Sequence, residues 1–198
     1  MAIELLAARV QSITARPTTA AFLQHHGPTC SQAVSRLVTA GVAGGAVRVL
    51  PLLPSAGEHA QDDVGPATAG TGATVLPAVD AARLADPVVG AIRAVQPRPS
   101  GRVVLLAPGS RRSDPSVAFA GLSQLLGRAL GEHIEIVDRP ANLPLEVGIG
   151  IVVPVIWAPG RLWDRLDARV SGTSIVPTPP LALIPGTAEA LATLVSGR

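Results

Sequence analysis

Three histidines follow two apolar stretches of the chain, and their side chains could bind a metal ion or move a proton. His59 comes shortly after the apolar run VRVLPLL at residues 47–53, and His25 and His26 directly follow the sequence TTAAFLQ at residues 18–24. If both stretches are parallel strands, their carboxyl ends meet at one edge of a sheet, which is where open α/β sheets bind ligands. Imidazole suits divalent ions such as Fe2+ or Co2+, and its neutral form accepts a proton near neutral pH.

Each of these groups also has an ordinary structural interpretation. An isolated histidine such as His59 more often faces solvent at the start of a helix, and the neighbouring histidine pair suits a polar turn. His133 begins a predicted strand, so it should lie at the opposite edge of the sheet. Ser110 and Arg111 follow a third apolar run, where a guanidinium could bind the carboxylates of a substrate. A solvated arginine is an equal alternative for Arg111.

Composition excludes several classes of protein. The chain has 198 residues, of which 47% are hydrophobic and 15% charged, so it can build an apolar core. All 16 basic residues are dispersed arginines and aromatic residues make up only 2%, which argues against a nucleic-acid surface. No apolar stretch is long enough to cross a membrane. The single cysteine, Cys30, excludes an internal disulfide and makes the cytoplasm the expected location.

Helical and extended patterns alternate along the sequence, which predicts an α/β protein with mainly parallel sheets. Apolar spacing predicts helices at residues 1–14, 31–40, 84–95, 114–130, 161–170 and 187–196. It predicts strands at residues 18–23, 47–53, 74–76, 102–107, 134–137, 147–157 and 174–176.

An internal repeat divides the chain into two related halves. The sequence VLPLLPSAG at residues 49–57 matches VVPVIWAPG at residues 152–160, an offset of 103. A second pair of segments matches at an offset of 100. With the linker-like sequence QPRPSG near residue 97, the repeat predicts half-domains at residues 1–97 and 98–198.

The segments AFLQHHGPTCSQAVSRLVTAG and VRVLPLLPSAGEHAQDDVGPA resemble the sirohydrochlorin chelatases, the class II tetrapyrrole chelatases of siroheme and cobalamin synthesis. That family has a strand ending in Phe-Leu-Glu, then Glu-Pro or Gly-Pro, and later a Val-Val-Pro-Leu-Leu-Leu strand followed by a Gly-x-His loop. The corresponding residues here end at Gln24, Pro28, Leu53 and His59. The sequence VLLAPGSRRSDP resembles the His-Gly-Ser-Arg opening of such a domain, with Pro108 in place of the histidine.

The resemblance implies two flavodoxin-like half-domains related by duplication, without a nucleotide cofactor. It implies insertion of Co2+ or Fe2+, or else Ni2+, into sirohydrochlorin or a related tetrapyrrole. His59 matches a histidine of the family's metal site, Gln24 stands at the position of the family glutamate, and His25 could substitute as a ligand. Ser110 and Arg111 are expected on the tetrapyrrole side. A non-catalytic tetrapyrrole- or metal-binding homologue, with or without homodimerisation, is the alternative.

Two departures from the family have structural consequences. The family's first histidine lies on an opening strand, whereas this sequence starts in the helix that would follow that strand. In a flavodoxin-like sheet the opening strand is central, so we expect a hole between residues 18–23 and 47–53. An upstream start, a rearrangement of the strands or a strand from another chain would each resolve it. In the second half, residues 139–146 are too few for a helical crossover.

Overall fold

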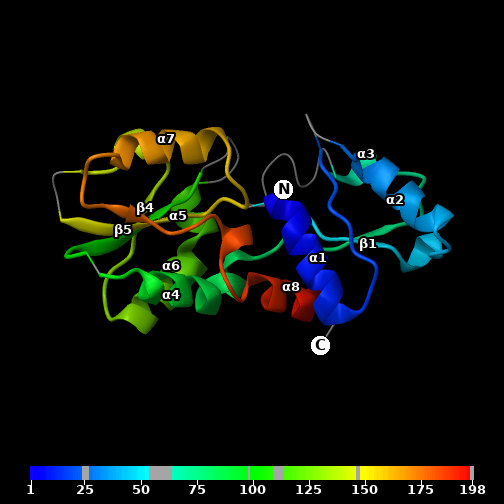
Figure 1. The fold of residues 1–198 in the computed structure, drawn as a ribbon, viewed down its shortest axis with the longest axis horizontal. Helices are drawn as coiled ribbons and strands as arrows, with labels where there is room; N and C mark the ends of the chain where they lie inside the picture. The colour runs from blue at the N-terminus through cyan, green and yellow to red at the C-terminus, as the bar shows by residue number, and fades with distance from the viewer. Residues whose placement is uncertain (24–26, 54–63, 98, 109–113, 146–147, 197–198) are drawn as a thin grey trace.

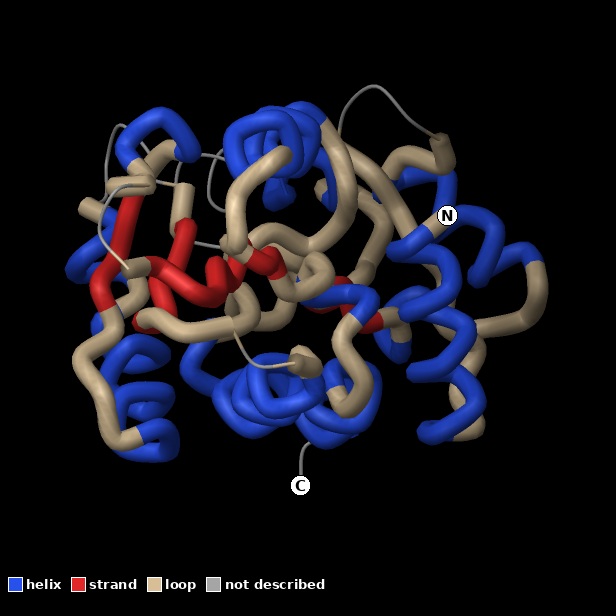
Figure 2. The backbone as a smooth tube through the Cα atoms, turned by 60° about the vertical axis from the view of Figure 1, so that its left-hand side comes forward, coloured by secondary structure: helices blue, strands red, loops and turns tan. Residues whose placement is uncertain are grey.

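The computed structural model describes residues 1–23, 27–53, 64–97, 99–108, 114–145 and 148–196. Within these ranges, helices pack on both faces of a layer of parallel strands (Figures 1 and 2). The helices are α1 (Ala2–Thr14), α2 (Cys30–Thr39), α3 (Val64–Thr68), α4 (Ala85–Ala94), α5 (Pro115–Ala118), α6 (Ala120–Leu130), α7 (Arg161–Val170) and α8 (Thr187–Ser196). The strands are β1 (Arg48–Val49), β2 (Thr74–Val75), β3 (Arg102–Leu106), β4 (Glu135–Val137), β5 (Ile149–Pro154) and β6 (Val176–Pro177).

The larger sheet has the strand order β4-β3-β5-β6, and all of its pairs are parallel. Alternate residues of β3 enter two different cores. Val103 and Leu105 pack with α4 and α6, whereas Val104 and Leu106 pack with α7. All four side chains are fully buried, which explains why this strand is a continuous apolar run instead of an alternating one.

The connection from β4 to β5 is short, and its described part contains no α-helix. A single 3-10 turn, Pro140–Asn142, lies between the two strands. They are not neighbours in the sheet, since β3 lies between them. The sequence predicts that residues 139–146 are too few for a helical crossover. Residues 139–145, the described part of this stretch, indeed contain no α-helix.

The first half of the chain contains a smaller parallel sheet, in which β1 pairs with β2. Two predicted strands are wrong in extent. Residues 18–23 form no strand and make only one isolated bridge, from Phe22 to Thr29. Of residues 47–53, only Arg48–Val49 form a strand. Both stretches are apolar enough for a strand, but a strand also needs a hydrogen-bonded neighbour. Among the described residues, β1 has a strand partner along one edge only.

The other main predictions of the fold are confirmed. The chain is α/β with parallel sheets, and the helices predicted at residues 161–170 and 187–196 have those bounds. The helix predicted for residues 114–130 is divided at Phe119 into α5 and α6. The internal duplication and the boundary between residues 97 and 98 remain predictions.

Two helices pack outside the half of the sequence that encodes them. Helix α4 precedes residue 97, yet it packs on α6 and β5 of the larger sheet. Helix α8 follows residue 98, yet it packs along α1. There, Arg9 Nη2 donates a 2.9 Å hydrogen bond to Glu189 Oε1. This bond holds the pKa of the Glu189 carboxyl below its usual range.

Replacing Gly101, which directly precedes β3, by alanine tests the packing there, and the same replacement of Gly90 in α4 is its control. Gly101 has a φ of +132°, and a Cβ there would lie 2.4 Å from the carbonyl oxygen of Gly148. Gly90 lies within α4 and a Cβ there would meet no atom within 4 Å. We expect Gly101→Ala to lower the free energy of unfolding by more than about 1 kcal/mol, and Gly90→Ala to raise it by about 0.4–1 kcal/mol.

Urea denaturation monitored by circular dichroism measures both changes. Equal stabilities of the two variants would contradict the close approach of the turn before β3 to β5.

Candidate functional site

The carboxyl ends of the two sheets point toward each other across the middle of the molecule (Figure 1). Residues 50–53 continue from β1, and Trp157 and Ala158 follow β5; both segments line the same cavity. Leu50 and Leu52 also pack against the core cluster that contains Trp157. Since ligands of α/β proteins bind beyond the carboxyl ends of the strands, this junction is the place in the fold where a site is expected.

The residues that the sequence proposes for chemistry all lie outside the described residues: His59, Gln24, His25, His26, Ser110 and Arg111. Their roles remain predictions. What the structure describes is the part of the chain on either side of them. Residues 54–63 follow the segment that continues from β1, and residues 109–113 follow the segment that continues from β3.

Helix α2 begins shortly after residues 24–26, and α5 begins after residues 109–113. Side-chain hydrogen bonds cap the N-terminus of each helix. Thr29 Oγ1 accepts a 3.3 Å hydrogen bond from the Gln32 main-chain N–H, and Gln32 Oε1 accepts one of 3.0 Å from the Thr29 N–H. Asp114 Oδ1 accepts a 2.8 Å hydrogen bond from the Ser116 N–H at the start of α5. The caps satisfy N–H groups that the first turn leaves without helical partners, so they fix where both helices begin.

His133 is the one histidine within the described ranges, and only Ile134 separates it from the start of β4. It therefore lies at the amino end of a parallel strand, whereas Pro108 follows the carboxyl end of the neighbouring strand β3. This arrangement agrees with the exclusion of His133 from the predicted site.

Neither a metal cluster nor a membrane helix occurs in the described part of the chain. No group of three or more His, Cys, Asp or Glu side chains there is arranged to hold a metal ion. No helix there is long and apolar enough to cross a membrane.

The cavity at the junction has a volume of about 930 Å3 and an apolar lining. Its walls include residues that sequence analysis did not bring together, namely Trp157 after β5 and Leu191 and Val195 of α8. No local signal marks them, because they are more than a hundred residues away from β1 in the chain. The indole N–H of Trp157 is buried and has no hydrogen-bond partner among the described atoms.

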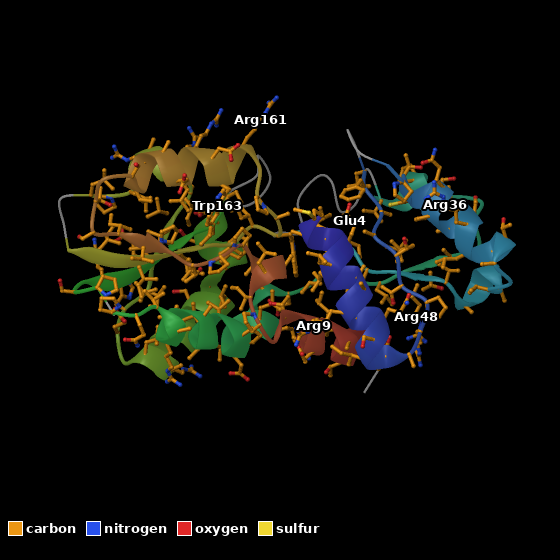
Figure 3. All side chains as sticks on the ribbon, viewed as in Figure 1. Glu4, Arg9, Arg36, Arg48, Arg161 and Trp163 are labelled. Carbon is orange, nitrogen blue, oxygen red and sulfur yellow. The ribbon has the colours of Figure 1, made fainter. Side chains whose placement is uncertain are left out.

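Two basic side chains of the cavity wall lie beside the C-terminal end of α8. Arg48 Nη1 and Arg16 Nη1 donate hydrogen bonds of 3.2 and 3.4 Å to the carbonyl oxygen of Val195, near the C-terminus of α8. Figure 3 labels Arg48 near the C-terminal end of α1, whereas Glu4 is labelled near its N-terminal end. Both arginines line the cavity, but these bonds direct their guanidinium groups to the helix end, where cations are favoured.

Comparison with solved structures shows that the chain has the fold of the sirohydrochlorin chelatases. It aligns with the sirohydrochlorin chelatase SirB from Bacillus subtilis subspecies spizizenii, solved in complex with cobalt, at a TM-score of 0.72 and 19% identity, over 96% of this chain and 85% of SirB. It aligns with CbiX, the terminal enzyme for biosynthesis of siroheme in denitrifying bacteria, at a TM-score of 0.69 and 22% identity, over 99% of this chain and 90% of CbiX.

No protein-family model matches the sequence, and no curated protein matches it significantly. The likeness is therefore one of fold, at sequence identities too low to carry residue roles across.

Cys30 gives a test of the interior next to the cavity. Its side chain is buried and lines the cavity wall, and burial raises the pKa of the thiol above its ordinary value. Because the thiolate is the reactive form, we expect a disulfide reagent to label the folded protein at pH 8 much more slowly than the urea-unfolded protein. The rate should continue to rise above the pH at which a free cysteine has ionised. Equal rates for folded and unfolded protein would contradict the burial.

Proposed function

We propose that this protein inserts a divalent metal ion, Co2+ or Fe2+, into sirohydrochlorin or a closely related tetrapyrrole. The observation that carries the proposal is the combination of the fold with the position of one motif. The chain aligns over almost its full length with two chelatases that act in this chemistry by name. The Gly57-Glu58-His59 motif follows the segment that continues from β1, whose carboxyl end is directed toward the other half.

The chemistry requires a group that receives protons as the metal enters. The entering ion forms bonds to all of the ring nitrogens while the two pyrrole N–H bonds break, so two protons leave for each divalent ion and the charge is conserved. A neutral imidazole can bind the arriving ion or accept one of these protons. We assign this work to His59, with His25 as a second ligand and Gln24 as a neutral oxygen donor. Ser110 and Arg111 would hold tetrapyrrole carboxylates.

The apolar cavity is not the tetrapyrrole site in this proposal. A tetrapyrrole with several carboxylates would place charges against an apolar wall, where they would lose hydration without gaining partners. The cavity's two arginines are bonded to the end of α8. We place such a substrate beyond the carboxyl ends of the strands, where open α/β sheets bind their ligands.

A non-catalytic tetrapyrrole- or metal-binding role is the second candidate. Gln24 favours it, because an amide at the position of the family glutamate cannot act as a carboxylate base. The sequence assigns neither a particular metal nor a siroheme or cobalamin pathway.

A metal-insertion assay separates the two candidates. Sirohydrochlorin is incubated with the protein and Co2+, Fe2+ or Ni2+, and its absorbance change is followed. We expect His59→Ala to lower turnover about a hundredfold or more, the usual contribution of a positioned acid or base. His133→Ala is the matched control and should retain activity, since that residue precedes β4 at the other end of the strands.

Turnover that survives His59→Ala unchanged would remove the assigned role. Tight binding of sirohydrochlorin without turnover by the parent protein would select the binding role instead.

A further inference from the structure

The apolar cavity of the first half lies within the strand layer, between helices on both sides. Side chains of α1, including Leu6 and Val10, form one wall. Side chains of α2, including Ala33 and Val34, form another. The remaining sides are residues 16–23, the stretch that contains β1, the residues Trp157 and Ala158 after β5, and Leu191 and Val195 of α8. Figure 2 shows helices above and below the layer of strands. A cavity of about 930 Å3 in this layer is a gap in the sheet itself.

The edge of β1 next to this gap has unused main-chain groups. The carbonyl oxygens of Val47, Val49 and Pro51 accept hydrogen bonds of 2.9, 2.8 and 3.3 Å from N–H groups of β2 and the residues after it. In a parallel strand, the main-chain N–H and C=O groups of successive residues point to opposite edges. The main-chain groups of Leu50 and Leu52 therefore point away from β2. Neither residue takes part in a hydrogen bond among the described residues. Such an edge is a template for a further strand.

The second half of the same chain shows what occupies the equivalent place. There β5 pairs with β6 along one edge, as β1 pairs with β2, and both pairs are parallel. The sequence repeat superposes residues 49–57 on residues 152–160. Along its other edge β5 pairs with β3, whose apolar residues are fully buried between two layers of helices. The first half has the cavity on that side of β1.

The side chains beside this edge are less buried in the first half of the chain than in the second. Leu50, Leu52 and Leu53 are only half-buried although they lie in the interior layer. The corresponding interior residues Val153 and Val155 are fully buried. Covering the leucines would remove apolar surface from water, which is the main favourable term in association.

We propose that this gap binds one extended apolar peptide strand that lies outside residues 1–198 and adds, parallel, to the free edge of β1. A strand with apolar side chains on both faces matches the walls formed by α1 and α2. Its main-chain groups pair with those of Leu50 and Leu52. An apolar small molecule would match the walls but leave these groups without partners, which is unfavourable. Peptide binding by strand addition draws on both interactions.

The test uses a synthetic peptide with the sequence of β3 and the residue after it, Arg-Val-Val-Leu-Leu-Ala, and with charged residues added at both ends for solubility. Binding is measured by the fluorescence anisotropy of the labelled peptide. It is also measured by Trp157 emission in a Trp163→Phe background, because the chain has only two tryptophans. We expect saturable binding and slower hydrogen exchange of the Leu50 and Leu52 amides. The control peptide is N-methylated at alternate residues, so it keeps its apolar side chains but loses donors, and it should bind about tenfold more weakly or worse.

Two tryptophan substitutions on α1 provide the matched variants. Ala7 lines the cavity, whereas its neighbour Ala8 is exposed and does not line it. Ala7→Trp should fill the gap and abolish peptide binding, and Ala8→Trp should leave it unchanged; circular dichroism checks that both variants are folded.

Three outcomes would overturn the proposal. Absence of binding at millimolar peptide would show that no strand is accepted. Equal binding of the N-methylated peptide would identify a site for apolar molecules without strand pairing. A dimer that excludes the peptide, detected by gel filtration, would identify a second copy as the occupant. If Ala7→Trp fails to fold, the hydrogen exchange of Leu50 and Leu52 in the parent protein decides the question.

Discussion

Strand pairing along both edges and helix cover on both faces is the constraint on which this structure depends. In the larger sheet β3 and β5 satisfy it, and their apolar residues are fully buried. In the smaller sheet β1 satisfies it along one edge only. The difference accounts for the short strands of the first half, the half-buried leucines after β1 and the cavity beside them. One missing pairing therefore has effects throughout that half of the molecule.

The sequence predicts helices better than strands in this chain, for a physical reason. The main-chain hydrogen bonds of a helix are local, so the apolar spacing was enough to place residues 161–170 and 187–196. A strand takes its partners from distant parts of the chain, and an apolar pattern reports burial, not pairing. Residues 18–23 have the composition of a strand but form none. The hole expected beside them coincides with the cavity, and that expectation came from the resemblance to a family whose opening strand is central, not from a local pattern.

In the candidate site, too, local sequence predicts some residues and not others. His59 follows from its motif and from the strand before it, which local sequence can indicate. The presence of Trp157 and Leu191 near β1 depends on how two halves of the chain pack, and no local pattern encodes that. The comparison with solved structures establishes the fold alone, and the residues proposed for the chemistry rest on the sequence motif.

Helices α4 and α8 each pack against elements from the other half of the sequence, and this packing connects the two sheets. Helix α4 covers the larger sheet, and α8 packs on the first helix of the other half. If either half were to melt, its neighbour would lose a helix and expose apolar surface. The chain should therefore denature as one cooperative unit, and neither half is expected to be autonomous. The same packing should also oppose hinge motion between the two sheets, because such a motion would pull α4 or α8 from the surface on which it lies.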